Sequence, residues 1–241
     1  MARPKTVEEL AAALEAALGS RLVALVLYGS TARGTHVPGR SDVNTLLIVD
    51  AVDEPLLAAI APSIAEWSKN GHPAPILLSA AEWRDSADVF AIEYQEMREA
   101  HRVLAGRDPW AGVTVQRADL RRQLEQELMG KLVRLRQAYA ALRDDPKRLA
   151  AVLSASMAGF LTMVRALLRL AGRTPPPTPS PAAPDALVRE AAVLLGLPPE
   201  PLAELFGQAR GRALKLSPGD PRAAAYLAAV ARAADYVNRL T

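Results

Sequence analysis

The chain contains 241 residues, half of them hydrophobic, so it can bury a substantial core in one large domain or two small ones; we expect two. Its formal charge is +3 and its isoelectric point about 9.4, a mild basic balance that does not indicate a nucleic-acid partner and is compatible with small anionic ligands. Cysteine is absent, which excludes disulfides, thiolate metal sites and cysteine nucleophiles, and the three histidines are too far apart in sequence for a histidine-rich metal site.

The N-terminal segment carries several glutamates where a secretory signal would need an unbroken apolar stretch, so we expect a cytoplasmic protein. Within this segment, Thr6 and Glu9 match a helix capping box, and apolar residues then recur at helical spacing. Residues 22–28 (LVALVLY) are apolar without a gap, as in a strand buried on both faces, and Gly29 with Ser30 ends the run. The predicted order is therefore a helix, a strand, a turn and the start of a further helix.

Three further segments of the first domain follow clear patterns: a strand over 44–49, a helix over 54–69 and a strand over 74–79. Segment 88–106 fits neither the helical nor the strand period cleanly, and we expect one strand with a short helix there. Strands that alternate with helices in this way predict a small α/β sheet.

The pattern changes after residue 110. Leucines at three- and four-residue spacing predict a long helix that continues to residue 142, and a second helix over 147–170, a proline-rich connection over 174–184 and three shorter helices follow. The apolar stretch 149–164 is shorter than the roughly 20 residues of a bilayer span, so we interpret it as a buried bundle helix and expect no membrane partner. We therefore predict an α/β domain over residues 1–112 and an all-α helical domain over residues 113–241.

The segment that carries chemistry lies between the first two predicted strands. A Gly-Ser turn that leaves a buried strand exposes backbone amides and a hydroxyl, which suit phosphate oxygens, and Gly29 permits a close approach. Asp42 lies 12 positions after Ser30, far enough for the chain to return to a neighbouring strand, where its carboxylate could hold Mg²⁺ against the same phosphates. In the loop between them, Arg33 and Arg40 are candidates for steering phosphate, although arginines in such loops are commonly solvated.

At these residues the sequence resembles the DNA polymerase β-like nucleotidyltransferase superfamily, in its small bacterial form with an added helical domain. The motif of that family is Gly-Ser, a short helix often ending in Ala-Arg-Gly, and Asp-x-Asp at a strand start; GSTARG and SDVN occupy those places here. The resemblance implies a small mixed sheet with flanking helices, followed by an all-α helical bundle. It also implies two metal ions held by three carboxylates, and transfer of a nucleoside monophosphate to an acceptor hydroxyl with loss of pyrophosphate.

The chain departs from this pattern at two carboxylate positions. Asn44 stands where the family has its second carboxylate, and an amide offers a neutral oxygen ligand without basicity. The counterpart of the third carboxylate falls in the predicted strand over 74–79, where residues 76–78 are all apolar. Glu93 or Glu96 could take its place only if the segment IEYQEM is the strand beside the site. Two-metal catalysis needs more than one carboxylate, so the sequence supports nucleotide binding better than efficient transfer.

Two functions remain open from the sequence. In the first, the protein binds a nucleoside triphosphate with Mg²⁺: Gly29, Ser30, Arg33 and Arg40 contact the nucleotide, Asp42 and Asn44 hold the metal, and Glu93 activates the hydroxyl of an acceptor that the sequence does not identify. In the second, the protein is a catalytically inactive pseudo-nucleotidyltransferase, and the helical domain binds a protein partner or a second copy of the chain.

Overall fold

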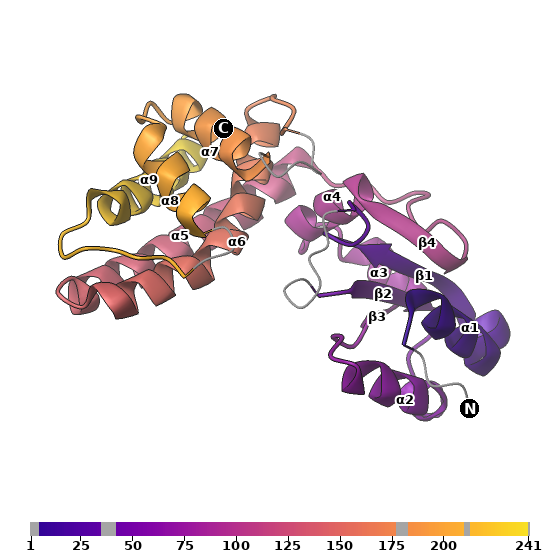
Figure 1. Cartoon of the computed structure of the whole chain (residues 1–241). Helices are drawn as coiled ribbons and strands as arrows, with labels where there is room; N and C mark the ends of the chain where they lie inside the picture. The colour runs from indigo at the N-terminus through magenta and orange to yellow at the C-terminus, as the bar shows by residue number, and fades with distance from the viewer. Residues whose placement is uncertain (1–4, 35–41, 177–182, 210–212, 241) are drawn as a thin grey trace. The chain divides into compact units, whose positions relative to one another are not determined.

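The computed structural model describes residues 5–34, 42–176, 183–209 and 213–240. The chain forms two compact units, Met1–Val115 and Gln116–Thr241, whose elements follow one another along the colour gradient of Figure 1. Arg40 and most of the proline-rich connection over 174–184 lie outside the described residues.

The first unit contains α1 (Val7–Leu18), a 3-10 helix (Gly19–Arg21), β1 (Leu22–Tyr28), β2 (Asn44–Val49), α2 (Glu54–Lys69), β3 (Ile76–Ser79), α3 (Ala80–Asp85), α4 (Ala91–Glu99) and β4 (His101–Gly106). The capping box at the start of α1 is confirmed, because the Thr6 hydroxyl accepts from the Glu9 amide and the Glu9 carboxylate accepts from the Thr6 amide. The predicted bounds of β1, β2 and α2 are also confirmed. β3 begins two residues later than predicted, after Pro75, which has no amide to donate to a strand ladder.

The four strands form one mixed sheet in the order β3-β2-β1-β4. β1 runs antiparallel to both β2 and β4, whereas β2 and β3 are parallel and are joined through α2. The predicted mixed α/β sheet is therefore confirmed. At one end of the sheet the last residue of β1, Tyr28, pairs with Asn44 at the start of β2 and with His101 at the start of β4.

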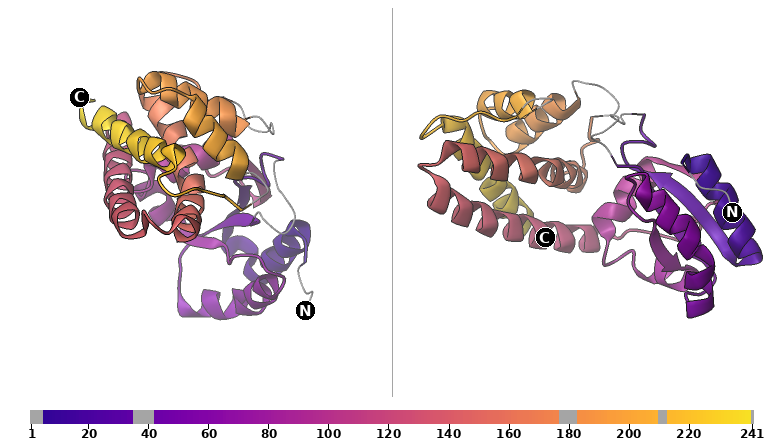
Figure 2. Two further views of the ribbon diagram at one scale, coloured as in Figure 1. Left: turned by 60° about the vertical axis from the view of Figure 1, so that its left-hand side comes forward. Right: turned by 60° about the horizontal axis from the view of Figure 1, so that its bottom comes forward.

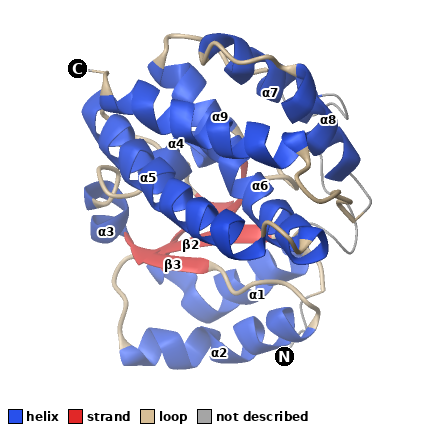
Figure 3. Ribbon diagram, turned by 90° about the vertical axis from the view of Figure 1, so that its left-hand side faces the viewer, coloured by secondary structure: helices blue, strands red, loops and turns tan. Residues whose placement is uncertain are grey.

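Each face of the sheet packs against a different layer of helices. On one face, buried leucines of β1 and β2 pack against α1 and α2, which lie together below the strands in Figure 3. On the other face lies an aromatic cluster in which Trp83 stacks on Tyr94 at 4.1 Å and meets Trp110 edge-on at 4.9 Å. All three rings are buried and contribute to the packing of this face. Both faces are therefore covered, and the residues open to ligands are at the ends of the strands.

The segment IEYQEM is not a strand. It forms α4, whose buried residues Ala91, Tyr94 and Met97 recur at helical spacing, and β4 follows it directly. β1 already has β2 on one side and β4 on the other, so the sheet has no place for a further strand next to it. The expectation of one strand with a short helix across 88–106 is confirmed, but the helix comes first.

The second unit contains α5 (Arg117–Leu142), α6 (Pro146–Leu170), α7 (Ala183–Leu194), α8 (Glu200–Ala209) and α9 (Pro221–Asn238). The two long helices α5 and α6 run side by side in both views of Figure 2, and α9 packs against both. The helix predicted over 147–170 is confirmed as α6, which begins one residue earlier, at Pro146. Its length and hydropathy would also suit a membrane span, but half of its most apolar window is buried, as in the core helix of a bundle.

Candidate functional site

The candidate site is built around the turn that ends β1. Gly29 has φ +79°, a conformation that favours glycine, and its carbonyl accepts a 3.0 Å hydrogen bond from the Arg33 amide. The Gly34 amide donates to the Thr31 carbonyl at 3.2 Å. Residues 29–34 thus form one closed turn, and the described part of the link between β1 and β2 contains no helix, although the sequence predicted a helix start there. The amides of Arg33 and Gly34 are therefore engaged within the turn.

The start of β2 lies against this turn. A Cβ atom at Gly29 would come 3.4 Å from Nδ2 of Asn44, so the amide side chain of Asn44 occupies the space beside the glycine. The Thr31 hydroxyl donates to the carbonyl oxygen of Asp42 at 3.4 Å, and Asp42 itself is exposed. The structure therefore brings together the Gly-Ser turn, Asp42 and Asn44, which the sequence had placed on adjacent strands.

Arg33 does not have the solvated position that is common for an arginine in such a loop. Its Nη2 donates to the Glu96 carboxylate at 2.5 Å and to the Glu96 carbonyl at 3.3 Å. The two side chains are only 17% and 14% exposed. Arg33 therefore connects the turn to α4. If its guanidinium also bound a phosphate, it would do so while paired with Glu96.

Glu93 also lies at this end of the sheet. It was considered as a third carboxylate only if the segment IEYQEM was a strand, but this segment is the helix α4. It lies in the first turn of α4 and is exposed. Burial raises the pKa of the Tyr28 hydroxyl, and the negative charge of Glu93 raises it further. Tyr28 is thus held in its protonated, hydrogen-bond-donating form, with the Glu93 carboxylate in its electrostatic neighbourhood.

β3 supplies no third carboxylate. In the parallel register of β2 and β3, Leu46 pairs with Ile76. Continued two residues further back, before the start of β3, this register would place Ala74 opposite Asn44. No residue from Ala74 to Ser79 is acidic. Among the described residues, no group of three or more histidine, aspartate or glutamate side chains is arranged to hold a metal ion. A pair of metal ions therefore does not fit the described side chains.

A single Mg²⁺ does fit them. This ion is commonly bound by one or two carboxylates together with substrate phosphates and keeps several water ligands. The exposed Asp42 offers one carboxylate, and Asn44, beside the turn, offers a neutral amide oxygen. An ion held by these two side chains would need the phosphates of a nucleotide to complete its ligands.

Two further residues reach the site, and the sequence analysis gave neither of them a role. Tyr28 and His101 face each other as strand partners at the end of the sheet. Nδ1 of His101 lies 3.1 Å from the Met97 carbonyl and 3.2 Å from that of Arg98, and because a carbonyl can only accept, Nδ1 carries the proton in these contacts. Their positions could have indicated them, because both residues lie at strand ends that meet next to the Gly-Ser turn.

No family model matches the sequence, and no curated protein matches it. Among solved structures, the crystal structure of spectinomycin adenyltransferase AAD(9) from Enterococcus faecialis with ATP and spectinomycin is similar, with a TM-score of 0.51 and 12% sequence identity. The match covers 95% of this chain and 96% of that chain. At this identity the likeness shows the fold alone. The protein thus has a nucleotidyltransferase-like fold: a small mixed sheet with flanking helices, followed by a helical region.

Proposed function

We propose that this protein belongs to the DNA polymerase β-like nucleotidyltransferase superfamily and binds a nucleoside triphosphate with Mg²⁺ at the Gly29-Ser30 turn. The observation that carries the proposal is the placement of this turn against Asn44, with Asp42 tied to Thr31, in a fold similar to that of an adenyltransferase solved with ATP. The backbone at Gly29 and Ser30 and the Ser30 hydroxyl suit phosphate oxygens, and the exposed Asp42 suits the metal.

We further propose that the nucleoside monophosphate part of the bound triphosphate is transferred to an acceptor hydroxyl. The acceptor oxygen attacks the α-phosphorus, the bond between that phosphorus and the bridging oxygen breaks, and pyrophosphate leaves. Glu93 would take the hydroxyl proton; its exposure and its electrostatic effect on Tyr28, at the same end of the sheet, support this role. Mg²⁺ would neutralise charge on the phosphates. Asp42 and Asn44 orient that ion, and the turn orients the triphosphate.

Because two of the three carboxylates of the family motif are missing, we expect any transfer to be slow. Asn44 brings no negative charge. Opposite it, just before β3, the register of the two strands leads to Ala74, which brings no carboxylate either. Both departures also favour the second candidate function, a pseudo-nucleotidyltransferase that retains the fold and acts through partners of the helical unit. The two candidates differ in one observable property, namely whether nucleotide binding leads to release of pyrophosphate.

Calorimetric titration with ATP and GTP, with and without Mg²⁺, tests the nucleotide site. We expect metal-dependent binding that Asp42→Ala abolishes. Asp88→Ala is the matched control, because Asp88 is an exposed aspartate of the same unit that lies outside the candidate site. Absence of nucleotide binding, or equal loss in the two variants, would overturn the proposal and direct the search to protein partners.

A second assay separates transfer from binding. Pyrophosphate release would be measured with ATP, Mg²⁺ and a panel of hydroxyl-bearing acceptors, beginning with spectinomycin because the similar structure contains it. Under the transfer hypothesis, Glu93→Gln retains nucleotide affinity and loses turnover. Nucleotide binding without pyrophosphate release across the panel would favour the pseudo-enzyme.

A further inference from the structure

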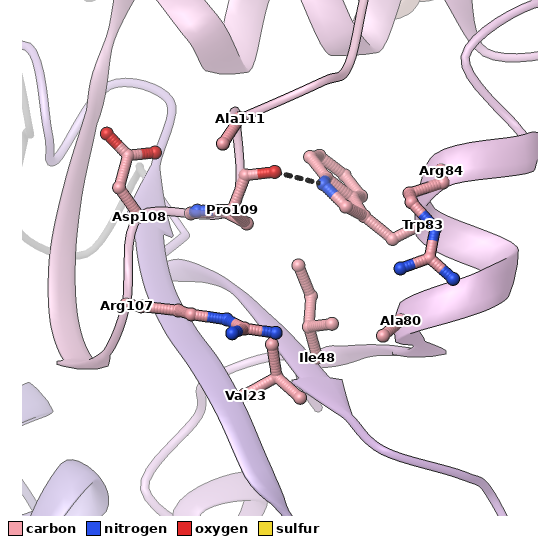
Figure 4. A pocket seen from close by; sticks show the side chains of 9 residues that line it. All are labelled: Val23, Ile48, Ala80, Trp83, Arg84, Arg107, Asp108, Pro109 and Ala111. Atoms are coloured by element: carbon pink, nitrogen blue, oxygen red, sulfur yellow. Dashed lines mark hydrogen bonds between the residues drawn. The ribbon is translucent and has the colours of Figure 1, made fainter.

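A pocket in the first unit lies at the other end of the sheet from the Gly-Ser turn. Its volume is about 270 Å³, and it is bounded by Val23 near the start of β1, Ile48 near the end of β2 and Ala80 at the start of α3 (Figure 4). Val23 and Gly29 are six residues apart on or next to one strand, which corresponds to about 20 Å. The pocket is therefore separate from the candidate nucleotide site.

The floor and inner wall of the pocket are apolar and held in place by hydrogen bonds. The indole of Trp83 forms part of the wall, and its N–H donates to the Pro109 carbonyl at 2.9 Å. The Tyr94 hydroxyl donates to the Trp83 carbonyl at 2.7 Å from behind the wall. A wall of this kind is preformed, so a ligand would not have to bear the entropic cost of ordering it.

Two arginines stand at the rim. Arg107 follows β4, and its amide donates to the Val23 carbonyl at 3.0 Å, whereas Arg84 lies in the last turn of α3. Figure 4 shows the Arg107 guanidinium beside Val23 and the Arg84 guanidinium on the side of Ala80. Both residues are exposed, and neither guanidinium has an ion-pair or hydrogen-bond partner within the described part of the chain.

The acidic residues close to this rim do not neutralise the two cations. Asp108 points away from the pocket in Figure 4, and its carboxylate accepts from the Trp110 amide at 3.0 Å. Glu82 on α3 is engaged in the capping box with Ser79. The pocket, which Asp108 also lines, thus combines an apolar interior with two arginines at its edge that form no ion pair within the described residues.

We propose that this pocket binds a small organic anion, namely a single planar ring that carries one carboxylate or phosphate group. The ring lies against Trp83 and the aliphatic floor, and the anionic oxygens pair with Arg84 and Arg107, whose guanidinium groups suit such oxygens. The volume sets the size, because pockets for drug-sized ligands begin at roughly 300 Å³. This site is independent of nucleotide binding.

The indole N–H signals in a ¹H–¹⁵N correlation spectrum give a direct test. The chain has three tryptophans, and Trp67 packs on the opposite face of the sheet, so its signal is an internal control; Trp83→Phe assigns the Trp83 signal. Benzoate and phenyl phosphate serve as probes. Benzyl alcohol tests the ring without charge, and acetate and inorganic phosphate test the charge without a ring.

We expect saturable shifts of the Trp83 signal with both ring anions and a weaker response to the other three compounds. Arg84→Gln and Arg107→Gln should each weaken binding by about 3- to 10-fold, since a charged hydrogen bond at an exposed rim is partly screened. Arg98→Gln is the matched control, because Arg98 is an exposed arginine of α4 outside the pocket. An unmoved Trp67 signal shows that each variant is folded.

Three results would overturn the proposal. The first is no shift of the Trp83 signal at about 10 mM of either ring anion, which corresponds to negligible affinity. The second is an equal response to benzyl alcohol, which would leave an apolar pocket without anion recognition. The third is equal binding by the wild-type protein and by the variant that carries both rim substitutions.

Discussion

Arg33 and Glu96 are 63 positions apart in the chain and form an ion pair directly beside the Gly-Ser turn. The contact joins a loop between two strands to a helix on one face of the sheet, and both side chains are largely buried. An ion pair in such surroundings costs more to break than a solvated one, because removal of one partner leaves the other charge without compensation.

Glu96→Gln should therefore reduce the free energy of unfolding of the first unit by about 1–3 kcal/mol. Urea denaturation measures the change, and Glu15→Gln, at an exposed position of α1, is the control. A double-mutant cycle with Arg33→Gln isolates the pairwise contribution. Additive effects of the two substitutions would show that the ion pair does not hold the turn.

Asn44→Asp should strengthen Mg²⁺-dependent ATP binding by roughly 10-fold, or about 1.4 kcal/mol, because it adds an anionic oxygen next to Asp42. Without Mg²⁺ the same substitution should weaken binding, since the added charge then repels the triphosphate. Calorimetry with and without the metal gives both values. An unchanged affinity in Mg²⁺ would place Asn44 outside the metal site.

Gly106→Ala should disrupt the junction between β4 and β1. A Cβ atom there would lie 2.3 Å from the Val23 carbonyl oxygen, which belongs to the backbone and cannot move aside cheaply. Gly71 also has positive φ but nothing within 4 Å of its would-be Cβ, so Gly71→Ala carries the backbone strain alone, about 1 kcal/mol. Thermal unfolding of the two variants should differ by more than about 2 kcal/mol; similar losses would contradict the clash.

Asp220→Asn should destabilise the helical unit in a pH-dependent way. Asp220 is 6% exposed and caps α9, and the Arg222 guanidinium beside it holds the pKa of its carboxyl well below the usual range, against the opposing effect of burial. A depressed folded-state pKa contributes stability that is present above the unfolded value of about 3.9 and is lost as the pH falls through the folded value.

At neutral pH the loss in Asp220→Asn should be about 2 kcal/mol, from the weakened ion pair and cap. Denaturation curves of the wild-type protein and the variant, recorded from pH 7 down to the acid range, should converge at low pH. A difference that stays constant over the whole range would assign the effect to packing alone.

Lys131 should also make stability depend on pH, but here the cause is burial of a charged group and not an ion pair. Lys131 lies on the long helix α5, is only 8% exposed and donates to the Ser156 carbonyl at 2.9 Å. Burial lowers the pKa of its ammonium group, and the charge of Arg134 lowers it further, while Glu127 opposes the shift. Between the lowered pKa of the folded state and the ordinary pKa of about 10.4, the unfolded chain binds more protons at this residue than the folded protein does. The free energy of unfolding therefore rises with pH in this range.

Lys131→Met should remove this pH-dependent part of the stability, because a thioether of similar length fills the same space without a charge. The stability of the wild-type protein relative to the variant should rise with pH below about pH 10, by at most about 1.4 kcal/mol per pH unit. Lys147→Met, at an exposed position near the start of α6, should show no such slope. Parallel pH profiles for the wild-type protein and Lys131→Met would refute the burial effect.

Local patterns of the sequence were sufficient to predict most of the secondary structure. The uninterrupted apolar run of β1, the Thr6 and Glu9 capping box and the leucine spacing of α5 each depend on neighbours within a few residues, and all three are confirmed. The Gly29, Ser30 and Asp42 spacing likewise predicted that the turn and the start of β2 would meet. Such features are encoded locally because the backbone conformation and the buried face follow from adjacent side chains.

Only the tertiary structure decided which distant residues share a site. The segment that carries Glu93 and Glu96 fits neither period cleanly, and its helical form depends on the burial of Tyr94 and Met97 under the sheet. That packing, and not any local signal, brings Glu96 to Arg33 and buries Lys131 between helices of the second unit. The period of a sequence shows which face of an element is buried, but the identity of the partner depends on the packing of the whole chain.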